Sequence, residues 1–300
     1  MMKDVIGDNM GHIMDVVMND YRKGRDIDRM DIGNVPDRDA VIDILQKMLR
    51  IVFPGYYREH SYRSFNAERQ ISVVVEDVSY NLAKQIIVAL RCQKGNEDRT
   101  YDELSDQAAD IVVRFFDRVP VIREYLDTDL QATFDGDPAA DSKDDIVLSY
   151  PGLLAITVNR IAHELWLLKV PLIPRMMTEY VHGQTGIDIH PGATIGKYFC
   201  IDHGTGIVVG STSVIGNHVK LYQGVTIGAL STKLGHKLHG HKRHPTIEDN
   251  VTIYSNASIL GGETVIGHDS VIGGSSFITA SVAPNSRVSF KCAGGSLSSD

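Results

Sequence analysis

Residues 187–228 read IDIHPGATIGKYFCIDHGTGIVVGSTSVIGNHVKLYQGVTIG. Aliphatic residues recur at every sixth position of this stretch, first at Ile189, Ile195 and Ile201 and then from Val209 onward. A six-residue repeat is typical of a parallel β-helix, in which each short strand buries one aliphatic side chain and the chain then turns a corner. Because stacked coils bury these side chains as one column, the sequence predicts a β-helix here.

The same spacing predicts which residues of the later coils point inward. They are Val209, Ile215, Leu221, Ile227, Ile247, Ile253, Ile259, Val265, Val271 and Phe277.

Two interruptions break the spacing. The step from Ile201 to Val209 is two residues too long, and after Ile227 an excursion loop leaves the coil near residues 231–245. Since functional residues concentrate on loops held by rigid scaffolds, both interruptions are candidate sites.

The chain before residue 187 has the period of α-helices. In residues 40–52, apolar side chains recur at intervals of three and four, and similar patterns run through 78–90, 104–116, 121–130 and 153–168. We therefore predict an α+β chain with three parts. They are an α-helical domain over residues 1–186, whose first 60 residues are an extension of unknown role, a β-helix domain over 187–290, and a flexible C-terminal tail over 291–300.

Composition narrows the classes of function. The 300 residues carry a net charge of −8, which does not favour a broad nucleic-acid-binding surface. No apolar run is long enough to span a membrane, and the N-terminus lacks the pattern of a signal peptide. The three cysteines are far apart without metal-type spacing, which is typical of a reducing compartment. A cytoplasmic location is expected.

Three elements of the chain resemble the serine acetyltransferase family. They are IDIHP at residues 187–191, IDHGTGIVVG at 201–210 and KRHP at 242–245, and Asp137-Pro138-Ala139 matches a further element upstream. Any one motif alone is weak, but together and in order they are specific. The resemblance implies a left-handed β-helix that forms a homotrimer or a dimer of trimers. It also implies transfer of acetyl from acetyl-CoA to the hydroxyl of L-serine in cysteine biosynthesis, in a cleft between neighbouring β-helices.

The resemblance also implies roles for single residues. His203 matches the catalytic base that takes the proton of the serine hydroxyl. Asp188 matches the partner carboxylate that orients the imidazole. Four further residues match positions that hold the zwitterionic substrate: Asp137 and Asp202 at its amino group and hydroxyl end, and Arg243 and His244 at its carboxylate.

Candidates for binding acetyl-CoA lie at the excursion loop. Backbone N–H groups near Gly228 and Ala229 are candidates for stabilising the developing oxyanion, and Lys233 and Lys242 for meeting the phosphates. Four histidines in and next to the loop have spacing like that of metal ligands: His236, His239, His241 and His244. No metal is expected, because the neighbouring lysines would repel a cation and no carboxylate or cysteine joins the histidines.

Other functions on the same scaffold stay open. One is another hexapeptide-repeat O-acetyltransferase, with homoserine, O-phosphoserine or a sugar as acceptor. Two less favoured alternatives are a γ-carbonic-anhydrase-like zinc lyase and an inactive scaffold. Many family members end in an isoleucine that inserts into O-acetylserine sulfhydrylase, whereas this sequence ends in Ser299-Asp300, which speaks against a complex with that enzyme. Neither a nucleic-acid nor a membrane partner is expected.

Overall fold

The computed structural model describes residues 4–28, 35–57, 67–96, 98–231 and 240–289. Contacts divide the chain into two units, Met1–Val35 and Pro36–Asp300. The described helices are α1 (Val5–Tyr21), α2 (Arg38–Val52), α3 (Ala67–Arg91), α4 (Tyr101–Gly136), α5 (Lys143–Ser149), α6 (Pro151–Leu167) and α7 (Ile173–Thr185). The described strands are β1 (Asp188–Ile189), β2 (Thr194–Ile195), β3 (Cys200–Asp202), β4 (Val208–Val209), β5 (Val214–Ile215), β6 (Lys220–Tyr222), β7 (Thr226–Gly228), β8 (Thr246–Ile247), β9 (Thr252–Ile253), β10 (Ser258–Leu260), β11 (Val265–Ile266), β12 (Val271–Ile272), β13 (Phe277–Ile278) and β14 (Arg287–Val288).

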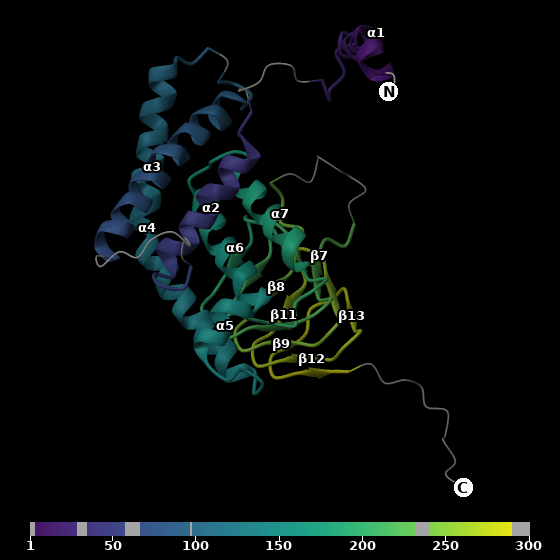
Figure 1. Ribbon diagram of the computed structural model, residues 1–300. Coiled ribbons are helices and arrows are strands. Elements are labelled where there is room, and N and C mark those ends of the chain that lie inside the picture. The colour runs from purple at the N-terminus through teal and green to yellow at the C-terminus, as the bar shows by residue number, and fades with distance from the viewer. Residues whose placement is uncertain (1–3, 29–34, 58–66, 97, 232–239, 290–300) are drawn as a thin grey trace. The chain divides into compact units, whose positions relative to one another are not determined.

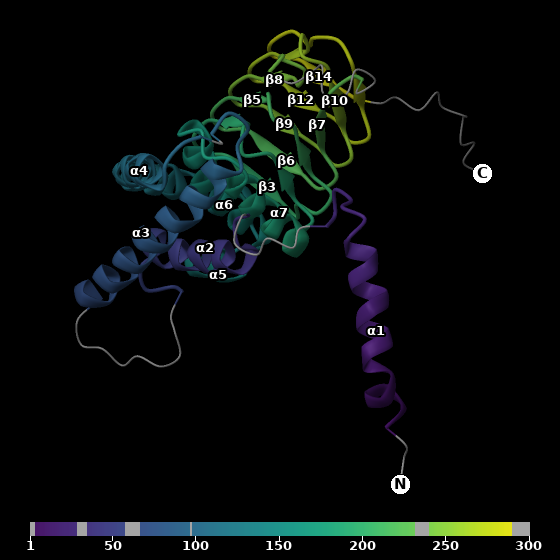
Figure 2. The same cartoon turned by 90° about the horizontal axis from the view of Figure 1, so that it is seen from above.

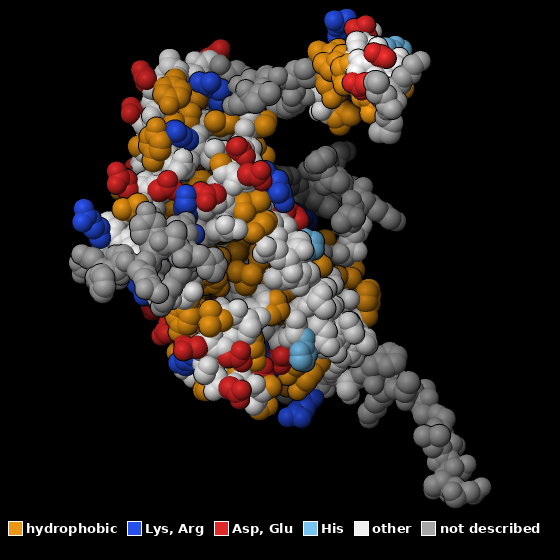
Figure 3. All heavy atoms as spheres, in the orientation of Figure 1, with side chains coloured by type: hydrophobic (Ala, Val, Ile, Leu, Met, Phe, Trp, Pro, Cys, Tyr) orange, Lys and Arg blue, Asp and Glu red, His pale blue; other side chains and the backbone are white. Residues whose placement is uncertain are grey.

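The first unit contains α1. The Asp4 side chain caps this helix by accepting a hydrogen bond from the backbone N–H of Gly7. None of its residues is buried, and apolar side chains gather on part of its surface (Figure 3). Among the described helices, none has the length and apolar character that a membrane span requires.

The remaining helices belong to the second unit, where side chains cap the starts of α2, α4 and α5. At the start of α4, Thr100 and Glu103 form a capping box in which each side chain accepts from the other residue's backbone N–H. The sequence shows two separate helical patterns on either side of Pro120, but α4 is one helix of 36 residues that runs through it. Phe115 and Ile122 are buried before and after the proline, so packing offsets the lost backbone hydrogen bond.

Residues 188–288 form the expected parallel β-helix, whose coils stack in Figures 1 and 2. Its strands form three sheets. Sheet A has the order β1-β4-β7-β10-β13, sheet B the order β11-β8-β5-β2, and sheet C the order β14-β12-β9-β6-β3. Strands pair in parallel with aliphatic residues in register, as in Ile189 with Val209. The inward column predicted from Ile189 to Ile259 is confirmed, since each of these side chains is buried.

The predicted column is wrong beyond Ile259. The residues that point inward there are Ile266 and Ile272, which pair with Ile247 and Ile253, whereas Val265 and Val271 lie one position out of phase. Phe277 of the predicted column is 71% exposed. One extra residue enters the turn after β10, where Gly261 has a φ of 105°. Glycine tolerates this backbone conformation, so the extra residue fits without disturbing the stacking.

The helices cover the start of the β-helix. Helices α4 and α6 contact β3, and α7 contacts β1 (Figure 2). A buried ion pair anchors this junction: Arg160 on α6 binds both carboxylate oxygens of Asp129 on α4 at 3.0 Å. The same carboxylate accepts from the backbone N–H of Phe199, and Arg160 donates to the carbonyls of Ile195 and Gly196. The helical part therefore fixes the first coil, where the candidate site begins.

Candidate active site

His203 lies in the turn that carries the chain from β3 in sheet C to β4 in sheet A. This turn contains the two-residue interruption, and His203 has a φ of 59°, a conformation that few residues other than glycine adopt. Its side chain is 71% exposed, and Nδ1 lies 3.7 Å from Oδ1 of Asp202. The insertion thus presents an accessible imidazole next to a carboxylate at a corner of the β-helix.

Asp202 is held by a lysine from the next coil. Nζ of Lys220 lies 2.9 Å from Oδ2 of Asp202 and donates to the backbone carbonyl of Gly136 at 2.7 Å. Burial lowers the pKa of Lys220, but its bonds to Asp202 and Tyr222 outweigh this effect, and the pKa is raised overall. Lys220 therefore links the end of α4 to the corner that carries His203.

Asp137, directly after α4, faces the same corner. Its carboxylate accepts from the backbone N–H of Ala139 at 2.8 Å and from the hydroxyl of Tyr150 at 2.7 Å. These two hydrogen bonds, with the nearby Lys220 and His203 side chains, lower the pKa of Asp137. The bond to Asp137 raises the pKa of Tyr150 to about 12. We call Asp137, Asp202 and His203 the acidic corner.

Arg243 and His244 lie where the chain passes from sheet A to sheet B. The Arg243 side chain donates to the hydroxyl of Ser211 at 2.7 Å, and Nδ1 of His244 lies 2.8 Å from Oγ1 of Thr212. His244 is buried, and a Cβ atom on Gly210 would overlap its ring. Burial, together with the charges of Arg243 and a neighbouring lysine, lowers the pKa of His244 to about 4. We call Arg243 and His244 the basic corner.

Lys242 binds the backbone of this corner. Its ammonium donates to the backbone carbonyls of Thr212, His244 and Pro245, at 2.8, 2.5 and 3.1 Å. An ammonium has three donors, so Lys242 could bind a phosphate only by giving up one of these bonds. Its predicted contact with acetyl-CoA stays a prediction, as do those of Gly228 at the end of β7 and Ala229 after it.

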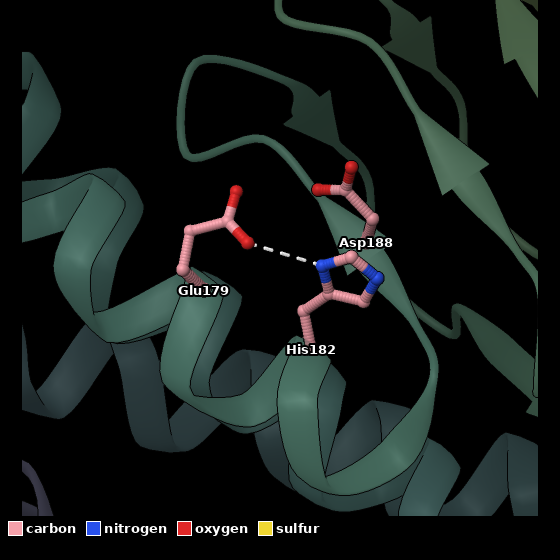
Figure 4. A group of neighbouring side chains, drawn as sticks. All are labelled: Glu179, His182 and Asp188. Atoms are coloured by element: carbon pink, nitrogen blue, oxygen red, sulfur yellow. Dashed lines mark hydrogen bonds and ion pairs between the residues drawn. The ribbon is translucent and has the colours of Figure 1, made fainter.

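Asp188 is the predicted partner of His203, but in the structure its carboxylate contacts a side chain of α7. Its Oδ1 lies 3.3 Å from Nη1 of Arg175 on α7, and no hydrogen bond joins it to His203, both residues being described. Arg175 also pairs with Glu179, which accepts from Nδ1 of His182 at 3.1 Å. Figure 4 shows Glu179 and His182 facing Asp188 across the gap between α7 and β1.

A ligand atom from each of Glu179, His182 and Asp188 lies within 4.8 Å of the others, and among the described residues this is the one group with the spacing of a metal site. The guanidinium of Arg175 contacts both carboxylates. Arg175 therefore supplies the positive charge that a metal ion would otherwise bring to these carboxylates.

His190 directly follows β1, where the chain passes from sheet A to sheet B. Burial, and then the positive charges of Arg175 and Arg243, lower its pKa to about 4. Its Nδ1 accepts from the backbone N–H of Gly192 at 2.9 Å, and the edge of its ring meets Trp166 at a centroid distance of 5.0 Å. His190 is therefore a neutral, fixed ring beside two arginines.

The residues of the acidic corner lie together in the structure. The basic corner lies elsewhere on the same chain. The acidic corner follows β3, between sheets C and A, whereas the basic corner lies in the passage from β7 to β8, between sheets A and B. One chain therefore presents the two halves of the predicted site at opposite ends of the strands of sheet A.

Sequence reasoning missed three side chains of the site: Tyr150, Arg175 and Lys220. The six-residue repeat carried a signal for Lys220 alone, because the strand containing Asp202 pairs with the one containing Lys220. Several predicted features lie outside the described residues: Lys233, the loop histidines His236 and His239, and the C-terminal tail.

No family model matches the sequence. The chain is 39% identical over 230 residues to a plasmid serine acetyltransferase of Synechococcus elongatus, across 73% of this chain and 70% of the relative. It is 47% identical over 128 residues to the serine acetyltransferase of Bacillus subtilis, across 43% of this chain and 56% of the relative. The crystal structure of Entamoeba histolytica serine acetyltransferase 1 in complex with L-cysteine superposes with a TM-score of 0.71 at 33% identity, covering 85% of this chain and 87% of that one.

Proposed function

The chain belongs to the serine acetyltransferase family, and we propose that it transfers the acetyl group of acetyl-CoA to the hydroxyl of L-serine with His203 as the general base. The observation that supports this assignment most is the acidic corner. There an exposed imidazole, Asp202 and Asp137 are drawn together by Lys220 and Tyr150. A base and two carboxylates suit a substrate with a hydroxyl and an ammonium group.

The proposed reaction proceeds by direct attack. The serine hydroxyl gives its proton to His203 as its oxygen forms a bond to the thioester carbonyl carbon. The carbon–sulfur bond then breaks, and the imidazolium returns the proton to the departing CoA thiolate. Asp188 stabilises the imidazolium and fixes its orientation. Backbone N–H groups near Gly228 stabilise the negative charge that develops on the carbonyl oxygen.

Recognition of the substrate divides between charges of opposite sign. Asp137 and Asp202 bind the ammonium and hydroxyl end of serine. Arg243 binds the carboxylate through its planar fork, which matches two carboxylate oxygens. His244, whose low pKa keeps it neutral near pH 7, donates a hydrogen bond to that carboxylate without adding a second charge.

The separation of the two corners supports a site shared between chains. Because sheet A stands between them in one chain, a second copy must bring its basic corner to the acidic corner of the first. A cyclic trimer of left-handed β-helices does so three times through one repeated interface, and two such trimers would form the hexamer. We also propose that the protein is cytoplasmic and that its reaction requires no metal.

Mixed assemblies of two inactive variants test the shared site. His203→Ala removes the base from the acidic corner, and Arg243→Ala removes the fork from the basic corner. Co-expressed in equal amounts and purified through two different tags, they are expected to recover about a third of wild-type activity, because about one interface in three of each mixed trimer pairs two intact corners. Thiol release from acetyl-CoA at low L-serine measures the recovery.

The matched control mixes His203→Ala with Asp202→Ala. Both changes lie in the acidic corner, so no mixed interface contains an intact pair and no recovery is expected. Recovery in this control, or none with Arg243→Ala, is the result that contradicts a site shared between chains.

A further inference from the structure

A continuous set of polar contacts leads from α7 to Asp188. His182 binds one oxygen of Glu179, at 3.1 Å from its Nδ1. The other oxygen of Glu179 contacts Arg175, one helical turn earlier. Arg175 in turn contacts Oδ1 of Asp188, at 3.3 Å from its Nη1. The order His182–Glu179–Arg175–Asp188 therefore joins the last helix to the first strand of the β-helix.

Each contact restrains the next. The hydrogen bond from His182 and the charge of Arg175 lower the pKa of Glu179, so Glu179 is ionised at neutral pH and holds the guanidinium. The guanidinium is planar and its donors are fixed in direction. A guanidinium held on one side by Glu179 is thus a rigid partner for the carboxylate on the other side.

The same side chains have the spacing of a metal site, but the contacts of Arg175 favour a different role. A divalent ion between Glu179 and Asp188 would have to displace a guanidinium that already pairs with both carboxylates. These contacts match a role in which the Arg175 guanidinium fixes the Asp188 carboxylate, rather than a vacant metal site.

We propose that Arg175, held by Glu179, is a positioning residue for acetyl transfer that fixes the orientation of Asp188. Arg175 binds Oδ1 of Asp188, which leaves Oδ2 for the His203 ring in the proposed reaction. This inference rests on the role proposed for Asp188. It adds a helical residue, thirteen positions before Asp188 in the printed sequence, to the groups on which the chemistry depends.

Steady-state kinetics of the full-length protein test the proposal. Arg175→Ala is expected to lower kcat by about 10–100-fold, as loss of an orienting partner typically does, with KM for L-serine and acetyl-CoA within about threefold of wild type. Arg175→Lys keeps the charge without the fork, so its kcat is expected between those of Arg175→Ala and wild type. Glu179→Gln should lower kcat in the same direction by a smaller factor. Circular dichroism and thermal unfolding confirm that each variant is folded.

Two results would overturn the proposal. One is a kcat for Arg175→Ala equal to that of wild type. The other is a loss that appears mainly in KM for L-serine, which would assign Arg175 to the substrate carboxylate, since Arg175 also lies near His190. The wild-type rate with L-serine tests the proposed function, and the ratio of variant to wild type tests Arg175, so the two failures are distinct.

Discussion

Replacing His203 by alanine is expected to lower kcat for serine acetylation by about 10²–10⁴-fold, the usual contribution of a general base. The imidazole is 71% exposed and lies beside Asp202, so its loss should leave little of the interior unpacked. KM for acetyl-CoA should stay close to the wild-type value, because the proposed role of His203 lies in proton transfer. Thiol release at saturating L-serine measures the change.

The matched control is His218→Ala. His218 also occupies a positive-φ turn, with a φ of 54°, but its ring stacks on Tyr198 at a centroid distance of 4.2 Å, away from the acidic corner. Both substitutions therefore impose a similar backbone cost, and only one removes the base. Equal effects of the two would mean that His203 acts through the conformation of its turn and not through its imidazole.

The second large effect concerns stability. Asp129→Ala should lower the free energy of unfolding by about 3–5 kcal/mol, because it leaves the Arg160 guanidinium buried without its counter-ion. The Asp129 side chain is 0% exposed and that of Arg160 is 8% exposed, so bulk water does not solvate the guanidinium that is left. Urea unfolding followed by circular dichroism measures the loss.

Asp110→Ala is the matched control on the same helix. Asp110 pairs with Arg114 on the surface, with both side chains largely exposed, and such pairs contribute little to stability. Replacing both buried partners, as Asp129→Leu with Arg160→Met, should recover part of the loss, because no unpaired charge remains but the backbone groups that the pair binds lose their partners. If Asp129→Ala and Asp110→Ala cost the same, the buried pair does not hold the helices to the first coil.

The six-residue repeat predicted most of the fold because each short strand has one aliphatic side chain that must be buried in the interior of the β-helix. It failed after Ile259 for a reason found in the sequence itself. Val265-Ile266 and Val271-Ile272 each offer two adjacent aliphatic residues, so hydrophobicity does not decide which one points inward. The turn at Gly261, with its extra residue and positive φ, decides it. The hand of the coil cannot be deduced from the period, and here it is a proposal.

The site was predictable to the extent that motifs and interruptions reveal it. The two-residue insertion pointed to His203, and the resemblance supplied roles for the acidic and basic corners. Lys220 was within reach of the repeat, because its strand pairs with the one that contains Asp202. Tyr150 could not be found in this way, because it meets Asp137 only through the packing of the helical part. Arg175 likewise approaches Asp188 through the packing of α7 on β1, which no local pattern in the sequence encodes.

The central claim is that this chain acetylates the hydroxyl of L-serine and recognises both charges of that substrate. The most direct test follows thiol release from acetyl-CoA by the purified wild-type protein with L-serine, homoserine, ethanolamine or 3-hydroxypropionate. We expect rapid release with L-serine, and kcat/KM lower by about 10²-fold or more when either charge is missing, because a charged group of the site then loses its partner in the substrate. Equal rates with ethanolamine, or no release with L-serine, would contradict the account.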